Sequence, residues 1–142
     1  PPEEDLGPPV VLMTPSRALP RPALLEAGRA IAAAIAADSR KVAFVASCDW
    51  GHRHLESGPY GYHPASAEVD AEIVAAIQAN DLASLDSITD ERAADAAIDG
   101  LWQTLVLAGV LEGTGFQADL MIYEAPNYYG MIVASFAPDG GQ

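Results

Sequence analysis

The sequence predicts an α/β fold, with a βαβ-containing mixed sheet flanked by helices and a C-terminal β-hairpin. Near the N-terminus, two short apolar runs enclose a stretch with helical spacing of apolar residues. A strand, helix and strand in this order form a βαβ unit, whose strands are normally parallel. Near the C-terminus, a Pro- and Gly-containing turn separates two further apolar runs, and this spacing favours an antiparallel hairpin.

The N-terminal third supplies the elements of the βαβ unit. Residues 1–8 are Pro-rich and acidic and resemble a linker. Val10–Met13 is a short apolar run bounded by prolines, which predicts a buried strand. Residues 22–38 are expected to form an amphipathic helix, because apolar or small residues recur at helical spacing and a proline suits its first turn. Val42–Ala46 predicts the second buried strand.

The remaining elements are separated by Gly, Pro and Asn residues, which commonly end helices and strands. A long loop over residues 48–64 precedes a helix that begins near Pro64 and ends near Ala79. Residues 81–88 predict a short helical turn, and Thr89 is a plausible N-cap. The last segments are a helical stretch over 93–111, as one helix or as two broken at Gly100, and strands over 120–123 and 131–136.

Length, charge and cysteine content limit the classes of partner and setting that the chain can have. A chain of 142 residues suits a single domain, residues 1–142. The formal net charge of −13 disfavours nucleic acid and anionic membranes as partners, because both require clustered basic residues. No apolar run is long enough to cross a bilayer. Cys48 is the single cysteine, so no internal disulfide can form, and a reducing, cytoplasmic setting is expected.

Chemistry-bearing side chains gather in the loop that follows the second predicted strand. In open α/β sheets, ligands bind beyond the carboxyl ends of the strands. Asp49 and His52 lie three residues apart there and could form a carboxylate–imidazole pair, as general acid–base chemistry requires. His54 and His63 add imidazoles to the same loop. Imidazole and carboxylate groups also ligate iron or zinc, although this spacing matches no fixed zinc pattern.

Each of these residues also has an ordinary structural interpretation. A loop histidine is more often hydrogen-bonded or solvated than functional, and Asp49 could cap the loop backbone. Cys48 is expected to be a small buried residue rather than a nucleophile. The aromatic side chains could line a flat apolar ligand site, with ordinary packing as the default; they are Trp50, Tyr60, Tyr62, Tyr128 and Tyr129.

Several segments together resemble one known family. Val42–His52 ends in Ser-x-Asp-x-x-His, and Gly58–Asp70 precedes a helix and an Asn-Asp-Leu element at Asn80–Leu85. Ala97–Leu101 opens an apolar helix, and Tyr123–Pro126 precedes the last strand. In order and spacing, these segments resemble the class III extradiol ring-cleavage dioxygenase subunit-B superfamily, which includes LigB-like and Memo-like proteins.

The resemblance implies opening of a catechol-type ring by O2 at non-haem Fe(II), with another divalent metal as an alternative. It gives His52 the acid–base role and Asp49 the carboxylate position of the turn. Two histidine ligands of the family come from an N-terminal half with no counterpart in this sequence, and the third ligand falls at Asp99. His54, His63 and Tyr62 are assigned to the substrate site.

The resemblance also shapes the expected organisation. The chain would be the C-terminal portion of a longer dioxygenase-like domain, completed by an N-terminal half or a partner subunit, and an oligomer is expected because an incomplete sheet needs cover. Two alternatives stay open. One is a Memo-like, non-catalytic protein that binds a metal or a peptide, which Gly51 and Asp99 favour because both differ from the usual pattern. The other is an accessory subunit of such an enzyme.

Overall fold

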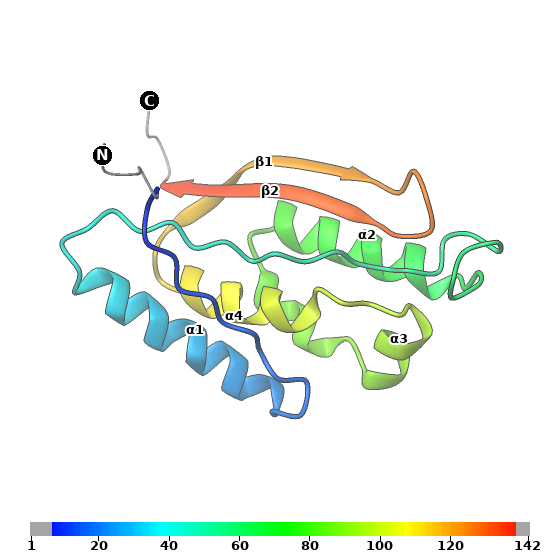
Figure 1. Cartoon of the computed structure of the whole chain (residues 1–142), viewed down its shortest axis with the longest axis horizontal. Coiled ribbons are helices and arrows are strands. Elements are labelled where there is room, and N and C mark those ends of the chain that lie inside the picture. The colour runs from blue at the N-terminus through cyan, green and yellow to red at the C-terminus, as the bar shows by residue number, and fades with distance from the viewer. Residues whose placement is uncertain (1–6, 139–142) are drawn as a thin grey trace, which may run out of the picture.

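The computed structural model describes residues 7–138, and most of the predicted linker therefore lies outside the described residues. A layer of helices carries a two-stranded hairpin on one side (Figure 1). The elements are the α-helices α1 (Arg21–Ala36), α2 (Ala65–Gln78), α3 (Asp90–Asp95) and α4 (Leu101–Leu111), the 3-10 helix η1 (Leu82–Ser87), and the strands β1 (Phe116–Glu124) and β2 (Met131–Pro138). The α/β class is thus confirmed.

The helices lie where the apolar spacing predicted them. α1 begins with a proline in its first turn and buries Leu24 and Gly28. Thr89 caps α3, since its side chain accepts a hydrogen bond from the backbone N–H of Arg92 at 3.2 Å. The stretch over 93–111 divides into two helices, and Gly100 is the N-cap residue of α4.

The core lies between the helices and the hairpin, and α4 is its central element. α4 buries residues on nearly all sides, including Leu101, Leu105 and Val106. α2 contributes Val69 and Ile73, which are almost completely buried. Because apolar burial is the main favourable term in folding, these helices fix the framework on which the loops are held.

The C-terminal hairpin is confirmed and is longer than predicted. β1 and β2 pair antiparallel from Glu124 opposite Met131 to Phe116 opposite Pro138, with an irregularity between Ala118 and Leu120. β1 packs against α2, so one face of the hairpin covers the helical layer (Figure 1).

The predicted βαβ unit is wrong in its strands. Val10–Met13 and Val42–Ala46 flank α1 as expected, but neither is a strand, and the sheet of the described residues consists of β1 and β2 alone. A strand requires a neighbour that satisfies its backbone N–H and C=O groups. Within residues 7–138 the hairpin pairs with this segment further along, where the backbone N–H of Trp50 donates to Gly130 O at 3.0 Å.

The two predicted strands are also not buried. Val11 and Leu12 are 96% and 90% exposed, and Val45 is 78% exposed. Both runs were predicted to be buried strands, whereas among these side chains Phe44 is half-buried against the core.

No helix among the described residues is long and apolar enough to cross a membrane.

Candidate functional site

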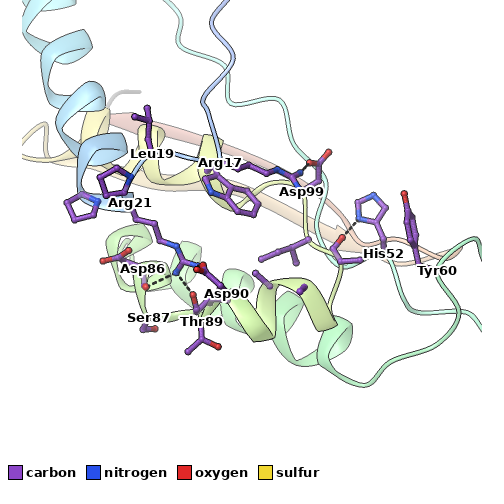
Figure 2. Close-up of a pocket in the computed structure, with 18 residues that line it drawn as sticks. Arg17, Leu19, Arg21, His52, Tyr60, Asp86, Ser87, Thr89, Asp90 and Asp99 are labelled. Atoms are coloured by element: carbon purple, nitrogen blue, oxygen red, sulfur yellow. Dashed lines mark hydrogen bonds and ion pairs between the residues drawn. The ribbon is translucent and has the colours of Figure 1, made fainter.

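An open cleft of about 920 Å³ lies between the loop before α1, the η1–α3 region and the start of α4 (Figure 2). This volume is within the range of small-molecule sites. Its lining is about half polar and half apolar, and the polar side chains include His52, Tyr60, Asp99, Arg17 and Arg21. The cleft therefore contains three of the residues singled out from the sequence, His52, Tyr60 and Asp99.

His52 is held at the cleft by the end of α3. Its backbone N–H donates to Ala96 O at 2.9 Å, and its Nδ1 lies 2.9 Å from Ala97 O (Figure 2). A carbonyl oxygen can only accept, so Nδ1 carries the proton in this contact. In the neutral ring, Nε2 is then the free acceptor, and this tautomer suits a proton-accepting role.

Asp49 stands beside the same ring, as the spacing of three residues suggested. Its Oδ2 lies 3.4 Å from His52 Nε2. A proton on Nε2 would therefore face this carboxylate. The turn is packed tightly, because a Cβ at Gly100 would lie 2.6 Å from Asp49 O.

Three tyrosines surround His52. Tyr129 stacks on its imidazole with ring centroids 5.7 Å apart, Tyr60 meets it edge-on at 5.9 Å, and Tyr128 is tilted at 6.1 Å. Tyr128 and Tyr129 also contact each other, at 4.9 Å. The aromatic cluster expected from the sequence is thus formed in part. Trp50 is buried in the core instead.

The structure does not bring His54, His63 or Tyr62 into the lining of this cleft. His54 Nε2 is 2.8 Å from Asp70 Oδ2, a carboxylate in the interior. His63 Nδ1 accepts a hydrogen bond from the backbone N–H of Ala65 at 3.2 Å, which is a local contact at the start of α2. The Tyr62 side chain is largely exposed.

Asp99 lies on the cleft between Arg17 and His52 in the view of Figure 2, and it forms an ion pair with Arg17. Both side chains are more than half exposed. The guanidinium of Arg17 also lies 4.4 Å from the ring centroid of Trp102, as a cation–π contact. Sequence reasoning missed Arg17 and Trp102. Arg17 lies in the loop before α1, and its partner Asp99 is 82 residues further along the chain, so no local pattern connects them.

Arg21 is a second cation that sequence reasoning did not assign to the site. Its guanidinium donates to the backbone oxygens of Asp86, at 3.0 Å, and of Ile88, and it pairs with Asp90 Oδ1 at 2.6 Å. It therefore fastens the start of α1 to the far wall of the cleft.

Cys48 fits the structural interpretation of the sequence. Its Sγ lies 3.7 Å from Thr104 Oγ1 on α4. Burial raises the pKa of its thiol, and the nearby carboxylates of Asp49 and Asp99 act in the same direction. The thiol therefore stays protonated near neutral pH and is a poor nucleophile.

The described residues do not fit a complete iron site. No group of three or more His, Cys, Asp or Glu side chains within residues 7–138 converges on a common point where a metal ion could be held. His54 is directed to Asp70, and Asp99 is paired with Arg17. Iron of the two-histidine, one-carboxylate type would thus require ligands from outside this part of the chain.

Comparison with known proteins identifies the family. The sequence model for the catalytic LigB subunit of aromatic ring-opening dioxygenase matches residues 8–134. Since the match covers most of the chain, the protein belongs to this family, and the resemblance read from the sequence is confirmed at this level. The family's chemistry is that of a dioxygenase-type oxidoreductase.

Among the curated relatives, the protein CA_C1420 of Clostridium acetobutylicum is 33% identical over 99 residues. The alignment covers 68% of this chain and 21% of that protein. The chain therefore spans about one fifth of the length of this relative.

Proposed function

We propose that this chain forms part of a non-haem Fe(II)-dependent extradiol dioxygenase, which opens catechol-type rings with O2. Membership of the ring-opening dioxygenase family supports the reaction class. The single observation that carries the proposal is the orientation of His52, whose Nδ1 bonds to Ala97 O while Asp49 stands beside Nε2. This arrangement suits a residue that takes a proton from an aromatic hydroxyl group and later returns it.

The steps assigned to this chain are binding and proton transfer. A phenolic hydroxyl within hydrogen-bond reach of His52 Nε2 would transfer its proton there, and the carboxylate of Asp49 would stabilise the resulting imidazolium. The aromatic ring of Tyr60, which lines the cleft beside His52, favours a flat substrate. A bound iron would supply Lewis-acid activation, and Asp99 is the residue of this chain that the resemblance gives as one of its ligands.

We propose that the missing iron ligands come from another polypeptide segment, either in a longer protein or in a partner subunit. Asp99 is the cleft carboxylate that the resemblance gives as a ligand, and it would first have to leave Arg17. Iron is the metal that the family generally uses, whereas the described residues alone provide no three-ligand group.

The test is oxygen consumption by the protein purified from its native source, reconstituted anaerobically with Fe(II) and supplied with a broad panel of catechols. We expect ring-opened product in step with oxygen uptake. His52→Ala should lower kcat by about 10²- to 10⁴-fold, the usual contribution of a positioned acid–base group.

The matched control is His63→Ala, because that imidazole does not line the cleft. It should keep a rate close to wild type, and a large loss would instead support the substrate contact inferred from the sequence. Equal rates for wild type and His52→Ala would refute the acid–base role. A folded, iron-loaded protein that turns over none of the catechols would refute the reaction.

A second candidate is a Memo-like protein that binds a metal or a peptide without ring cleavage. The ion pair that occupies Asp99 favours it. It predicts ligand binding without oxygen uptake in the same experiment. An accessory subunit, the remaining alternative, predicts that His52→Ala leaves the rate of the assembly unchanged.

A further inference from the structure

A buried polar cluster lies under the loop that carries His52 and takes no part in the proton transfer proposed above. Its centre is Asp70 on α2, which is 1% exposed. Asp70 Oδ1 accepts from the backbone N–H of Gly51 at 2.8 Å, and Oδ2 accepts from the hydroxyl of Tyr123 at 2.9 Å and from Nε2 of His54 at 2.8 Å. Three donors thus converge on one carboxylate in the interior.

The donors are matched to an anionic acceptor. A carboxylate offers acceptor sites only, so in its contact with Asp70 Oδ2 the His54 Nε2 acts as the donor. Burial raises the pKa of Tyr123, as does its hydrogen bond to Asp70, and the phenol therefore remains a donor. A buried charge is tolerated only when it is hydrogen-bonded in this way, since its desolvation would otherwise be very costly.

Each donor comes from a segment that reaches the candidate site. Gly51 is the residue immediately before His52. Tyr123 is on β1, next to the turn that carries Tyr128 and Tyr129. The same turn is tied to the His52 loop by backbone hydrogen bonds, from Gly130 N to Gly51 O at 2.9 Å and from His54 N to Tyr128 O at 3.1 Å.

The His52 loop and the tyrosine-bearing turn are also packed tightly where they meet α2. A Cβ at Gly130 would lie 1.9 Å from Asp70 Oδ2, so only glycine fits the turn at this point. Gly51 is equally confined, because a Cβ there would lie 2.7 Å from the Cβ of Ser66 on α2. The backbone on both sides of the His52 ring is therefore set by its contacts with α2.

We propose that Asp70, with His54 and Tyr123, is a positioning cluster that fixes the tautomer and orientation of His52 relative to the cleft. This inference rests on the proposed acid–base role of His52. Asp70 touches neither the cleft nor the His52 ring in any described contact and acts through the backbone of Gly51 and through the tyrosine-bearing turn. His54 thereby receives a role in place of the substrate contact predicted from the sequence.

The experiment is ¹⁵N NMR of the imidazole of His52 in the full chain, compared between wild type, Asp70→Asn, Tyr123→Phe and His54→Gln. Wild type should show the proton on Nδ1, bonded to Ala97 O. Asp70→Asn places an amide N–H₂ against one or more of the donors, so the loop should shift. We expect mixed tautomers, seen as a smaller separation of the Nδ1 and Nε2 signals, and a lesser change for Tyr123→Phe.

His54→Gln is the conservative rescue, because its amide can still donate to Asp70, and it should keep the wild-type tautomer. Ile77→Ala is the control for stability. Ile77 is buried on the same helix, and it is not a hydrogen-bond partner of Asp70. It should lower stability without changing the signals of His52.

With an active protein, Asp70→Asn should lower kcat by about tenfold to a hundredfold with little change in KM, as expected for a misplaced catalytic group. The NMR readout needs no activity, so it tests the cluster even where the proposed reaction fails. Wild-type imidazole signals in folded Tyr123→Phe and Asp70→Asn would overturn the inference. Should Asp70→Asn not fold, unchanged signals in Tyr123→Phe alone would overturn it.

Discussion

At the scale of single residues, the backbone of Ala97 is the feature that holds His52. Ala97 has a φ of +49°, in the left-handed region that residues other than Gly, Asn and Asp seldom adopt. It ends α3 in a Schellman motif, in which Ile98 N donates to Ala93 O at 3.1 Å and Ala97 N donates to Ala94 O at 3.0 Å. The carbonyl of this strained residue accepts the His52 Nδ1 proton.

Substitution at Ala97 should separate strain from side-chain contacts. Ala97→Gly relieves about 1–2 kcal/mol of left-handed strain and adds about 0.5–1 kcal/mol of unfolded-state entropy. We therefore expect a stability equal to wild type or up to about 1.5 kcal/mol higher. Ala97→Val should be clearly less stable, because a β-branched side chain is worse in this region. Urea denaturation gives the order, and a glycine variant markedly weaker than wild type would contradict the argument.

Part of the site was predictable at this scale. Asp49 and His52 are close in sequence, so their pairing could be inferred from a spacing of three residues after an apolar run. Asp70 could not be found in this way, because its partners are 16 to 53 residues away and it sits on a helix as one acidic residue among several. Ala97 contributes a backbone oxygen, which no side-chain pattern reveals.

At the scale of elements, the crossing of α1 and α4 shapes the helical layer. The two helices approach so closely at Gly28 and Gly109 that neither position has room for a methyl group. A Cβ at Gly28 would lie 2.1 Å from Val106 O, and one at Gly109 would lie 2.2 Å from Leu25 O. These contacts are with backbone atoms, so relief would require one helix to move. Arg17 and Arg21 precede or open α1, and its position therefore affects the cleft.

Gly109→Ala tests this crossing by the sign of its effect. Helix propensity alone favours alanine by about 1 kcal/mol, whereas overpacking typically costs about 1–3 kcal/mol. We expect net destabilisation and a lower urea midpoint. Ala33→Gly, on the exposed face of α1, measures the propensity effect without a change in packing. A Gly109→Ala protein more stable than wild type would show that the helices can separate at little cost.

The helices were predictable because each carries its own periodicity and end signals, such as Thr89 before α3. The hairpin was predictable because its two strands pair with each other. Val10–Met13 and Val42–Ala46 have the composition of strands, but a strand is completed by its neighbour. A pattern within one segment cannot report whether that neighbour is present.

At the scale of the whole molecule, the unpaired segments leave apolar side chains in contact with water. Val10, Val11 and Leu12 are between 82% and 96% exposed, and Val45 is 78% exposed. Exposed apolar segments with unpaired backbone are sites where another chain can add a strand. The net charge of −13 opposes the approach of a second copy, and salt screens that repulsion.

We therefore expect the 142-residue chain to self-associate with rising concentration and rising salt, as measured by sedimentation velocity. Val11→Lys and Val45→Lys should weaken association, because lysine on a strand edge disfavours pairing. Each substitution also lowers the net negative charge, which alone would strengthen association. Gln78→Lys, at the exposed end of α2, makes the same change of charge away from these segments and should not weaken it. A chain that stays monomeric under all these conditions would contradict the expectation, and equal weakening by Gln78→Lys would show that the segments are not the contact.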